Sequence, residues 1–360
     1  MTTLQIPGLR VADLQRWLAT DHPELLSTDK LEARVLAGGL SNLSYAISGG
    51  VRPWVLRRPP LGHVLSTAHD MKREYRVMTA LNDSAVPVPQ TEVFHDDSAG
   101  DAGVGSPFYL MELVSGKVLT QTTDNACFSR SQLRALSFEL AATLAQLHEV
   151  DWANIGLADF GRPEGFLQRQ AARWLRQFDQ SRSRPLPELD ELAAQLGKSI
   201  PETTMVSLLH GDFRLDNTLV APSSDGTPHI VTVLDWEMST IGDSLTDLGL
   251  FGLYWDIHSL EGASTSILAS AIDPRAGYAS FDEMLNHYAN SRNLDSLPDI
   301  SWYLAFASFK LAVILEGIHY RFTQGDTVGD GFDTVGQLVA PLARRGLNYL
   351  NQPAHFDKKD

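Results

Sequence analysis

Residues 210–217, which read His-Gly-Asp-Phe-Arg-Leu-Asp-Asn, constrain this chain more than any other feature of its sequence. Farther along, the apolar run 230–234 ends at Asp235, so Asp212, Asn217 and Asp235 are expected on loops next to short strands. Phosphoryl transfer needs one carboxylate to orient and deprotonate a hydroxyl, and hard oxygen ligands for the magnesium ion that neutralises a triphosphate. Asp212 suits the first role, and Asn217 and Asp235 suit the second.

The separate pieces of this pattern are weak evidence. His-Gly-Asp and Asp-Trp-Glu, the tripeptide at 235–237, occur in turns of many proteins, and a buried histidine such as His210 is more often a hydrogen-bonded scaffold residue. Arg214 could stabilise the charge of a transition state or form a surface salt bridge to Asp216, and both interpretations stay open. The elements that precede residue 210, in their order along the chain, supply the evidence that the separate motifs lack.

The strand-rich residues 1–114 predict a five-stranded sheet with one inserted helix. Apolar residues recur at helical spacing within 8–30 and again within 68–81. Short apolar runs between glycine, proline and polar residues predict the strands. These are two strands in a hairpin over 34–47, then single strands at 54–57, 91–94 and 107–114.

The turn of the expected hairpin reads Gly38-Gly39-Leu40-Ser41-Asn42. Glycines allow backbone amides to approach phosphate groups closely, and Ser41 or Asn42 could donate further hydrogen bonds. A plain hairpin turn explains the same residues equally well. Gly38, Gly39, Ser41 and Asn42 are therefore nucleotide-binding candidates that depend on the rest of the pattern.

A basic residue on the strand 54–57 is expected to hold nucleotide phosphates and to pair with a glutamate on the helix 68–81. Arg57 and Glu74 fit this pairing. Because side chains alternate between the two faces of a strand, Arg58 is expected on the opposite face and exposed to solvent.

Beyond Gly116 the hydrophobic pattern changes to long helical periodicities, which predict a helix-rich second half. A strand-rich half before a helix-rich half indicates an α+β architecture, with an N-terminal lobe of residues 1–113 and a C-terminal lobe of residues 114–360. The helices are expected at 133–148, 164–178, 281–290 and 302–322, with short β-like runs at 218–220 and 230–234.

The composition limits the classes of molecule that this protein is expected to bind. The formal net charge of -15, from 44 acidic and 29 basic residues, disfavours binding to nucleic acid or to an anionic membrane. The single cysteine, Cys127, excludes an internal disulfide framework. The N-terminus lacks the pattern of a secretory signal, and the apolar region 303–315, which Ser308 and Lys310 interrupt, predicts a buried helix. We expect a cytoplasmic protein, of open oligomeric state, that acts on a small molecule.

In these motifs the chain resembles the aminoglycoside phosphotransferase and choline kinase superfamily, which has a protein-kinase-like fold. The resemblance rests on Gly-Gly-Leu-Ser-Asn at 38–42, the pattern His-Gly-Asp-x-x-x-x-Asn at 210–217 and Asp-Trp-Glu at 235–237. It implies a nucleotide-binding lobe with an antiparallel sheet and one main helix, followed by a mainly helical catalytic and acceptor-binding lobe. Residues 242–249 look like the family's helix-opening stretch, whose acids are structural and brace the metal-binding loop.

The resemblance also implies nucleotide contacts. Backbone groups of Glu112 and Val114 would bind an adenine edge, although an edge strand leading to a linker explains 110–114 equally well. Arg57 departs from the family, which usually has lysine there. Arginine can still pair bidentately with carboxylate and phosphate, but its reach differs.

The implied activity is that of an ATP- and magnesium-dependent kinase, in which Asp212 receives a hydroxyl proton and the γ-phosphoryl group passes directly to that oxygen. The motifs look most like the branch related to the kinase-like N-terminal region of certain acyl-CoA dehydrogenases, and no flavin-binding domain is indicated. That branch suggests a hydroxyacyl thioester or hydroxy acid as acceptor. The wider family suggests an aminoglycoside or amino alcohol, and the choice between ATP and GTP stays open.

Two other classes of function fit parts of the pattern. A kinase-fold protein that binds nucleotide with little catalysis is suggested by the arginine at position 57, while the presence of Asp212, Asn217 and Asp235 argues against it. A metal-dependent hydrolase would use the same acids, but it would release phosphate without an acceptor.

Overall fold

The computed structural model describes residues 6–28, 30–36, 42–61, 70–266, 268–325 and 332–351. The chain divides into two compact units. The first comprises Met1–Gly116 and Val231–Glu237, and the second comprises Lys117–Ile230 and Met238–Asp360. The short segment after residue 230 therefore belongs with the N-terminal part of the chain, although it lies far from it in sequence.

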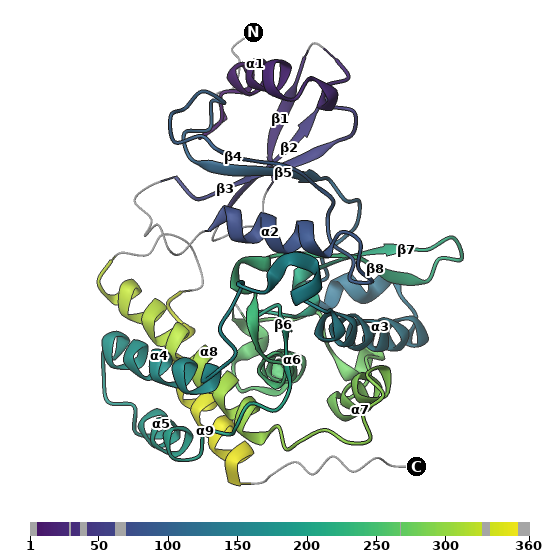
Figure 1. The fold of residues 1–360 in the computed structure, drawn as a ribbon. Helices are drawn as coiled ribbons and strands as arrows, with labels where there is room; N and C mark the ends of the chain where they lie inside the picture. Colours follow the sequence, from purple (N-terminus) through teal and green to yellow (C-terminus); the bar gives the residue numbers. More distant parts are fainter. Residues whose placement is uncertain are drawn as a thin grey trace. The chain divides into compact units, whose positions relative to one another are not determined.

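The first unit is built on a five-stranded antiparallel sheet in the order β1-β2-β3-β5-β4 (Figure 1). Its apolar runs form strands of five or six residues, each bounded by glycine, proline or polar residues as expected. Asp70 caps the helix α2 by accepting a hydrogen bond from the Arg73 amide. The elements are α1 (Val11–Asp21), β1 (Glu32–Leu36), β2 (Leu43–Ser48), β3 (Trp54–Arg58), α2 (Met71–Leu81), β4 (Thr91–Asp96) and β5 (Pro107–Glu112).

The two faces of this sheet are covered by different helices. Trp54 and Leu56 of β3 belong to the apolar core that also contains Trp17 of α1, whereas α2 packs against β4 and β5. Arg57 points to the opposite face from Trp54 and Leu56, since side chains alternate along a strand. The main core of the unit therefore lies on the α1 face, and the charged residues gather on the α2 face.

The expected exposure of Arg58 is wrong. Arg58 is on the face opposite to Arg57, as predicted, but it is buried, with 6% of its surface exposed. Its guanidinium donates to the carbonyls of Gly8 at 2.8 Å and Val104 at 2.7 Å. The segments before α1 and between β4 and β5 cover this face, which the pattern of β3 alone could not reveal.

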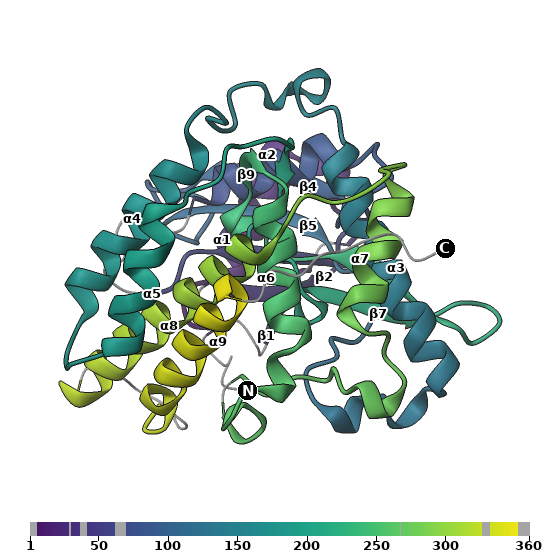
Figure 2. The ribbon, with the colours of Figure 1, turned by 90° about the horizontal axis from the view of Figure 1, so that it is seen from below.

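The second unit is mainly helical. Helices α4, α5, α8 and α9 pack on one another, and α3 packs on α7 (Figure 2). Of these, α5 and α9 were not predicted from the sequence. The helices are α3 (Arg130–Glu149), α4 (Phe166–Ser181), α5 (Pro187–Lys198), α6 (Leu245–Trp255), α7 (Phe281–Ser291), α8 (Ser301–Thr323) and α9 (Val339–Asn351).

Short strands position the loops of the second half of the chain. Strand β6 (Val206–Leu209) pairs antiparallel with β9 (Thr240–Asp243), so β6 delivers the chain directly into residue 210. Strands β7 (Thr218–Pro222) and β8 (Pro228–Val233) form the other two-stranded sheet, and β8 leads toward Asp235. The short sheets thus place the two polar segments singled out in the sequence.

The long apolar helix predicted for 302–322 is α8. Among the described residues it is the one helix that is long and apolar enough to cross a membrane, and most of it is buried inside the protein. This burial agrees with the expected core helix. The predicted order of five strands with one inserted helix, followed by a helix-rich half, is likewise present.

Candidate active site

The loop after β6 holds Asp212 and Asn217 together. The Asn217 side-chain amide donates to the backbone carbonyl of Asp212 at 2.8 Å and to its Oδ2 at 3.0 Å. A single 3₁₀ turn, Leu215–Asn217, brings the two residues into this contact. The amide nitrogen is thereby committed to Asp212, which leaves the Asn217 carbonyl oxygen as the atom suited to a hard metal ion.

Arg214 contacts both acids of the loop. Its guanidinium lies 3.6 Å from Asp212 Oδ2 and 3.6 Å from Asp216 Oδ2, distances of ion pairs that are longer than hydrogen bonds. It also lies over the ring of Tyr254, 4.7 Å from the centroid. The salt bridge that we considered from the sequence is thus present, together with a second contact to Asp212. Burial raises the pKa of Asp216, and Arg214 opposes this shift.

Asp247, in the first turn of α6, braces the same loop. It accepts hydrogen bonds from the backbone amides of His210 at 2.7 Å and Gly211 at 2.9 Å. His148 lies 3.3 Å from it on the other side. Burial alone would raise the pKa of Asp247, but its hydrogen bond and charge interaction with His148 hold the pKa below the ordinary value. The expected structural acid thus contacts the loop of Asp212, whereas the family pattern suggested the metal-binding loop.

Two residues before Asp212 have structural roles. His210 is completely buried, and its Nδ1 accepts a hydrogen bond from the Asp212 amide at 3.2 Å, which is the scaffold role expected. Gly211 has φ +84, and a Cβ there would lie 2.5 Å from the carbonyl oxygen of Met238. Only glycine fits this left-handed, crowded position without strain. We call Asp212, Arg214, Asn217 and the bracing Asp247 the Asp212 cluster.

A second polar cluster lies in the first unit. The predicted ion pair is present, because Arg57 Nε lies 3.0 Å from Glu74 Oε2. Tyr109, directly opposite Arg57 on the paired strand β5, donates its hydroxyl to the same Glu74 oxygen at 2.7 Å. Burial raises the pKa of Glu74, and Arg57 counteracts the rise. Burial lowers the pKa of Arg57, but Tyr109, Glu74 and Asp235 together raise it above its ordinary value.

Asp235 joins this cluster through a strained turn. Its Oδ1 lies 2.5 Å from Arg57 Nη2, and its backbone has φ 65, the left-handed region that non-glycine residues seldom adopt. The turn is held on both sides: the Val233 amide donates to Pro87 O at 2.8 Å, and the Trp236 indole donates to Val233 O at 3.1 Å. Such strain is concentrated at functional sites.

Asn42 lies among carboxylates. Its side-chain amide donates to Glu74 Oε1 at 3.1 Å and to Glu237 Oε2 at 3.2 Å. The expected hydrogen bond from Asn42 to a phosphate therefore has strong competitors within the first unit. We call Asn42, Arg57, Glu74, Tyr109, Asp235 and Glu237 the Arg57 cluster. The other hairpin candidates, Gly38, Gly39 and Ser41, lie outside the described residues.

Comparison with known proteins decides the family. The model of the family described as "Phosphotransferase enzyme family" matches residues 32–283. The chain belongs to this family. A crystal structure is known of a putative aminoglycoside phosphotransferase from Ralstonia eutropha JMP134, whose sequence is 30% identical to that of this phosphotransferase. The TM-score of the two structures is 0.80, and the match covers 96% of this chain and 99% of that one. The GDP complex of aminoglycoside 2'-phosphotransferase-IIIa, at 16% identity and a TM-score of 0.59 over 94% of this chain and 99% of that one, shares the fold.

The chain is also similar in sequence to acyl-CoA dehydrogenases, as its motifs predicted. Acyl-CoA dehydrogenase family member 11 of Gallus gallus is 32% identical over 325 residues, which are 88% of this chain and 40% of that protein. The phosphotransferase thus spans about two-fifths of the length of such relatives. The predicted protein-kinase-like fold, with its N-terminal antiparallel sheet and helical C-terminal part, is confirmed, as are the family and its small-molecule kinase class.

The residues predicted as metal ligands have suitable chemistry for magnesium. Asn217 offers an amide carbonyl oxygen, because its nitrogen is turned to Asp212. Asp235 offers Oδ2, because Oδ1 is the atom paired with Arg57. Both are hard oxygen ligands of the kind that Mg²⁺ prefers. The donor set of this phosphotransferase therefore fits the metal.

The segment predicted to contact an adenine keeps backbone groups available. The Glu112 amide donates to Gln90 O at 2.8 Å, and the Leu113 amide donates to Pro53 O at 3.0 Å. These bonds leave the Glu112 carbonyl as the group for an adenine edge. Within the described part of the chain, no backbone carbonyl accepts a hydrogen bond from the Val114 amide. The expected contacts of Glu112 and Val114 stay predictions.

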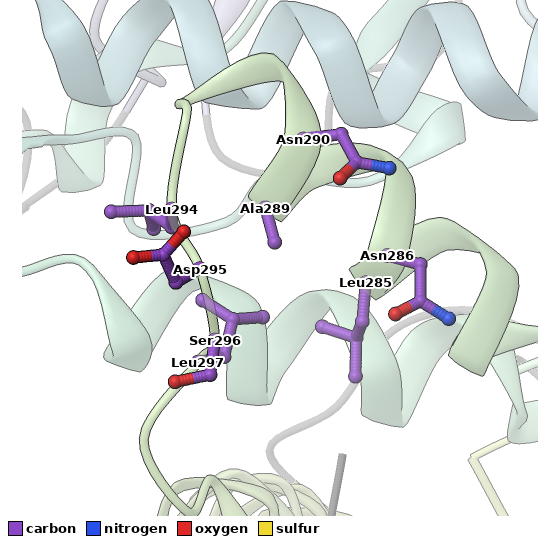
Figure 3. A pocket seen from close by; sticks show the side chains of 8 residues that line it. All are labelled: Leu285, Asn286, Ala289, Asn290, Leu294, Asp295, Ser296 and Leu297. Atoms are coloured by element: carbon purple, nitrogen blue, oxygen red, sulfur yellow. The ribbon is translucent and has the colours of Figure 1, made fainter. Parts of the chain in front are cut away.

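Two small hollows open in the second unit. One, about 290 Å³, lies at the end of α7 and in the loop after it; Asp295 and Ser296 are among the residues that line it, and no member of the Asp212 cluster is (Figure 3). The other, also about 290 Å³, adjoins the Asp212 cluster and is lined by Arg214, Asp216 and Tyr254 together with apolar residues. The second hollow alone belongs with the loop that carries the chemistry.

Sequence reasoning missed two members of these clusters and expected a third to brace a different loop. Tyr109 and Glu237 were never candidates, and Asp247 was assigned to a different loop. Tyr109 could have been found from the strand register, because an alignment of β3 with β5 places it opposite Arg57. Glu237 was visible as the third residue of Asp-Trp-Glu, but its partner Asn42 is too distant in sequence for spacing to indicate the contact.

Proposed function

We propose that this phosphotransferase moves the γ-phosphoryl group of ATP to a hydroxyl of a small molecule, with Mg²⁺ as the metal. The observation that carries the proposal is the contact between Asn217 and Asp212, which fixes one carboxylate oxygen within an anchored loop. A fixed carboxylate of this kind is the part that phosphoryl transfer requires from the protein on the acceptor side.

Asp212 is the residue proposed to act on the acceptor. Its carboxylate orients the hydroxyl and takes its proton as the oxygen attacks phosphorus. Asn217 limits the rotation of Asp212, and Asp247 holds the backbone on which both depend. Orientation matters because a reacting oxygen held in line with the phosphoryl group avoids most of the entropic cost of a bimolecular step. No covalent enzyme intermediate is needed.

Arg57 is the residue proposed to hold the nucleotide phosphates. Glu74 and Tyr109 fix its position, and its planar guanidinium can contact two phosphate oxygens at once. Arg214 supplies a second cation, beside Asp212, that would stabilise charge on the transferred group. Gly38, Gly39, Ser41 and the backbone at Glu112 and Val114 are proposed as further nucleotide contacts on the resemblance alone.

Asn217 and Asp235 would hold the magnesium ion through their free oxygens. When bound, the metal neutralises negative charge on the triphosphate oxygens. The strained backbone of Asp235 aims its carboxylate independently of a regular strand or helix, which is why this residue, rather than Asp225 in the exposed turn between β7 and β8, is assigned to the metal.

The acceptor is a hydroxylated compound of one of four classes. The similar structures include an aminoglycoside phosphotransferase and a choline kinase from Cryptosporidium parvum Iowa II, which suggest aminoglycosides and amino alcohols. The acyl-CoA dehydrogenase relatives suggest a hydroxy acid or a hydroxyacyl thioester. The GDP bound in one of the similar structures makes GTP the alternative donor to be compared with ATP.

The proposal is tested by a mass-spectrometric screen. Purified protein is incubated with ATP or GTP, Mg²⁺ and hydroxylated compounds of the four classes. The expected result is the gain of one phosphoryl group by a member of one class, in step with nucleoside diphosphate formation. Equal phosphate release with and without acceptors would indicate a hydrolase and contradict the proposal.

The second candidate function is a nucleotide-binding protein of this fold with little catalysis. The pairing of Arg57 with Asp235 favours it, because the ion pair occupies an oxygen of the proposed metal ligand. This alternative predicts magnesium-dependent ATP binding, measured by calorimetry, without a phosphorylated product in any of the four acceptor classes.

A further inference from the structure

Behind Asp247 lies a row of polar side chains that the proposed mechanism does not use. His148, near the end of α3, has its Nε2 at 3.3 Å from Asp247 Oδ2. Its other ring nitrogen, Nδ1, lies 2.7 Å from the Tyr288 hydroxyl on α7. His148 and Tyr288 are buried, with 3% and 1% of their surfaces exposed. Their contact is therefore shielded from water.

Arg292, the residue that ends α7, completes the row. Its Nη1 donates to the Tyr288 hydroxyl at 2.7 Å, and its Nη2 donates to the His148 carbonyl at 3.5 Å. Ser207 of β6 donates to the same carbonyl at 2.9 Å. Helix α3 packs on α7, and all of these residues belong to the second unit. Direct contacts thus connect the end of α7 with the strand that leads into residue 210.

The two ends of the row fix the direction of each hydrogen bond between them. An arginine side chain can only donate, and an ionised carboxylate can only accept. The Tyr288 hydroxyl accepts from Arg292, so its own proton is left for His148 Nδ1. Because Nδ1 then accepts, the ring proton of His148 is on Nε2, where it donates to Asp247 Oδ2.

Other protonation states of His148 fit these neighbours less well. A proton on Nδ1 alone would turn the lone pair of Nε2 toward the Asp247 carboxylate, so that two acceptors would face each other. A doubly protonated ring would bring a second cation to the hydroxyl that already accepts from Arg292. Burial also lowers the pKa of His148. The contacts therefore favour a neutral ring with its proton on Nε2.

The hydrogen bond from His148 matters because of what Asp247 holds. Asp247 accepts from the backbone amides of His210 at 2.7 Å and Gly211 at 2.9 Å. The Asp212 amide in turn donates to His210 Nδ1 at 3.2 Å. A change in the orientation of Asp247 would therefore move the backbone that carries Asp212. Small displacements of a reacting group cost large factors in rate.

We propose that Tyr288 and Arg292 are positioning residues for phosphoryl transfer, which hold the Nε2-protonated ring of His148 in the orientation that braces Asp247 and the loop of Asp212. They act through His148 and Asp247 and not by contact with the reacting atoms. The expected effect on rate rests on the proposed function, whereas the state of the ring and of the loop can be measured without any substrate.

The first test observes the ring of His148 by NMR in protein labelled with ¹⁵N-histidine. Of the 11 histidines, His148 gives the ring signals that His148→Gln lacks. Wild type at pH 7 is expected to show a protonated Nε2 and an unprotonated, hydrogen-bonded Nδ1. In Tyr288→Phe the Nδ1 signal should move toward that of a nitrogen without a donor. A wild-type ring that is charged, or protonated on Nδ1, overturns the inference.

The second measurement follows the loop. Leucine labelled with ¹³C at the carbonyl selects the amides of His148 and His210, the two histidines that follow a leucine in the sequence. Exchange of the His210 amide with solvent is expected to quicken at least about fivefold in Tyr288→Phe, because the loop opens more easily. Tyr320→Phe, at an exposed tyrosine of α8, is the matched control and should exchange like wild type. Equal rates in Tyr288→Phe and wild type overturn the inference.

Kinetics then measure the effect on transfer. In Tyr288→Phe we expect kcat to fall about tenfold with KM for ATP unchanged, because the hydrogen bond acts on the loop of Asp212 and not on nucleotide binding. Arg292→Met should show a smaller fall, and Arg292→Lys should restore part of it because a donor is kept. An unchanged kcat in Tyr288→Phe, or a rise in KM for ATP alone, overturns the positioning role.

Two features keep the test decisive. Arg292 is only partly buried, so Arg292→Met gives the same three measurements if thermal unfolding shows that Tyr288→Phe does not fold. Transfer to no compound at all contradicts the proposed function, and in that case the ring signals and the amide exchange still decide whether Tyr288 and Arg292 hold the loop.

Discussion

The Asp212 cluster and the Arg57 cluster are assembled in opposite ways. The Asp212 cluster gathers most of its members from one short loop, and a single acid from α6 anchors that loop. The Arg57 cluster draws its members from two strands, a helix, a hairpin and a turn, far apart in the sequence. A cluster within one loop can therefore be recognised from a sequence motif. A cluster drawn from several elements depends on how the strands pair.

The two clusters also differ in their electrostatics. In the Arg57 cluster one guanidinium pairs with both Glu74 and Asp235, and burial raises the pKa of Glu74 while Arg57 opposes the rise. In the Asp212 cluster the buried Asp247 is held ionised by His148 and by two backbone amides, and its pKa is lowered. Substitutions should therefore affect nucleotide handling in the first case and the stability of the loop in the second.

The largest effect within this comparison is expected for Asp235→Asn. Asparagine tolerates the left-handed backbone of this position, so the fold should be kept while a carboxylate ligand and the partner of Arg57 are lost. We expect kcat to fall about a thousandfold, because metal ligation supplies several kcal/mol of charge stabilisation. The measurement is steady-state transfer as a function of Mg²⁺ concentration. Turnover like that of wild type would show that Asp235 is not a metal ligand.

The next largest effect is expected for Arg57. Arg57→Met should lower kcat/KM for ATP by roughly 10- to 100-fold, because a charge-assisted contact to phosphate is lost and Glu74 is left buried without its cation. Arg57→Lys keeps the charge and restores the residue usual in the family, so its loss should stay within about tenfold. Steady-state kinetics at varied ATP concentration, with the acceptor saturating, gives kcat/KM for each of the two variants. Equal losses in both variants would contradict a role for the charge itself.

A change in stability is expected from Asp247→Ala. Removing this carboxylate leaves the amides of His210 and Gly211 buried without acceptors, which should lower the free energy of unfolding by about 2–5 kcal/mol. Urea denaturation measures it. Asp295→Ala is the matched control, since Asp295 is an exposed acid in the same unit, and it should change stability by less than about 0.5 kcal/mol. Similar losses in the two variants would mean that Asp247 does not brace the loop.

The smallest effect is expected from the pH dependence of His148. Burial lowers the pKa of this histidine below its ordinary value of about 6.5, and Asp247 opposes the shift. The unfolded state then binds a proton more readily than the folded state, so stability is complete above about pH 6.5 and is lost as the pH falls toward the folded-state pKa. The expected loss is smaller than the effect of Asp247→Ala.

Denaturation at pH 7 and pH 5 checks this expectation. His148→Gln should show a smaller change between the two pH values than wild type, because the titrating group is gone. A variant whose change equals that of wild type would assign the acid sensitivity to other groups, such as His287, whose pKa burial also lowers.

The fold was predictable where patterns are local. The strand runs, the helix of α2 and the long helix α8 follow from periodicities within one segment. Arg58 shows the limit: its face could be deduced from β3, but its burial depends on Gly8 and Val104, which come from other segments. The helices α5 and α9 were missed although both are amphipathic.

The candidate site was likewise predictable where its residues lie close together in the sequence. Asp212 and Asn217 could be paired from their spacing, because one loop and one 3₁₀ turn join them. Tyr109 could not be assigned from spacing, since its place opposite Arg57 is set by the pairing of β3 with β5. The contact of Asn42 with Glu237 connects distant parts of the sequence. Such contacts are a property of the folded chain and have no signature in either segment.

The most direct test of the central claim is the rate of phosphoryl transfer by Asp212→Asn. The substitution preserves shape and removes the charge that accepts the proton, so transfer should fall by roughly 10²- to 10⁴-fold while the affinity for ATP and the thermal unfolding temperature stay near those of wild type. Asp295→Asn serves as the control and should transfer like wild type. Unchanged transfer in Asp212→Asn, with the protein folded and ATP bound, would contradict the account.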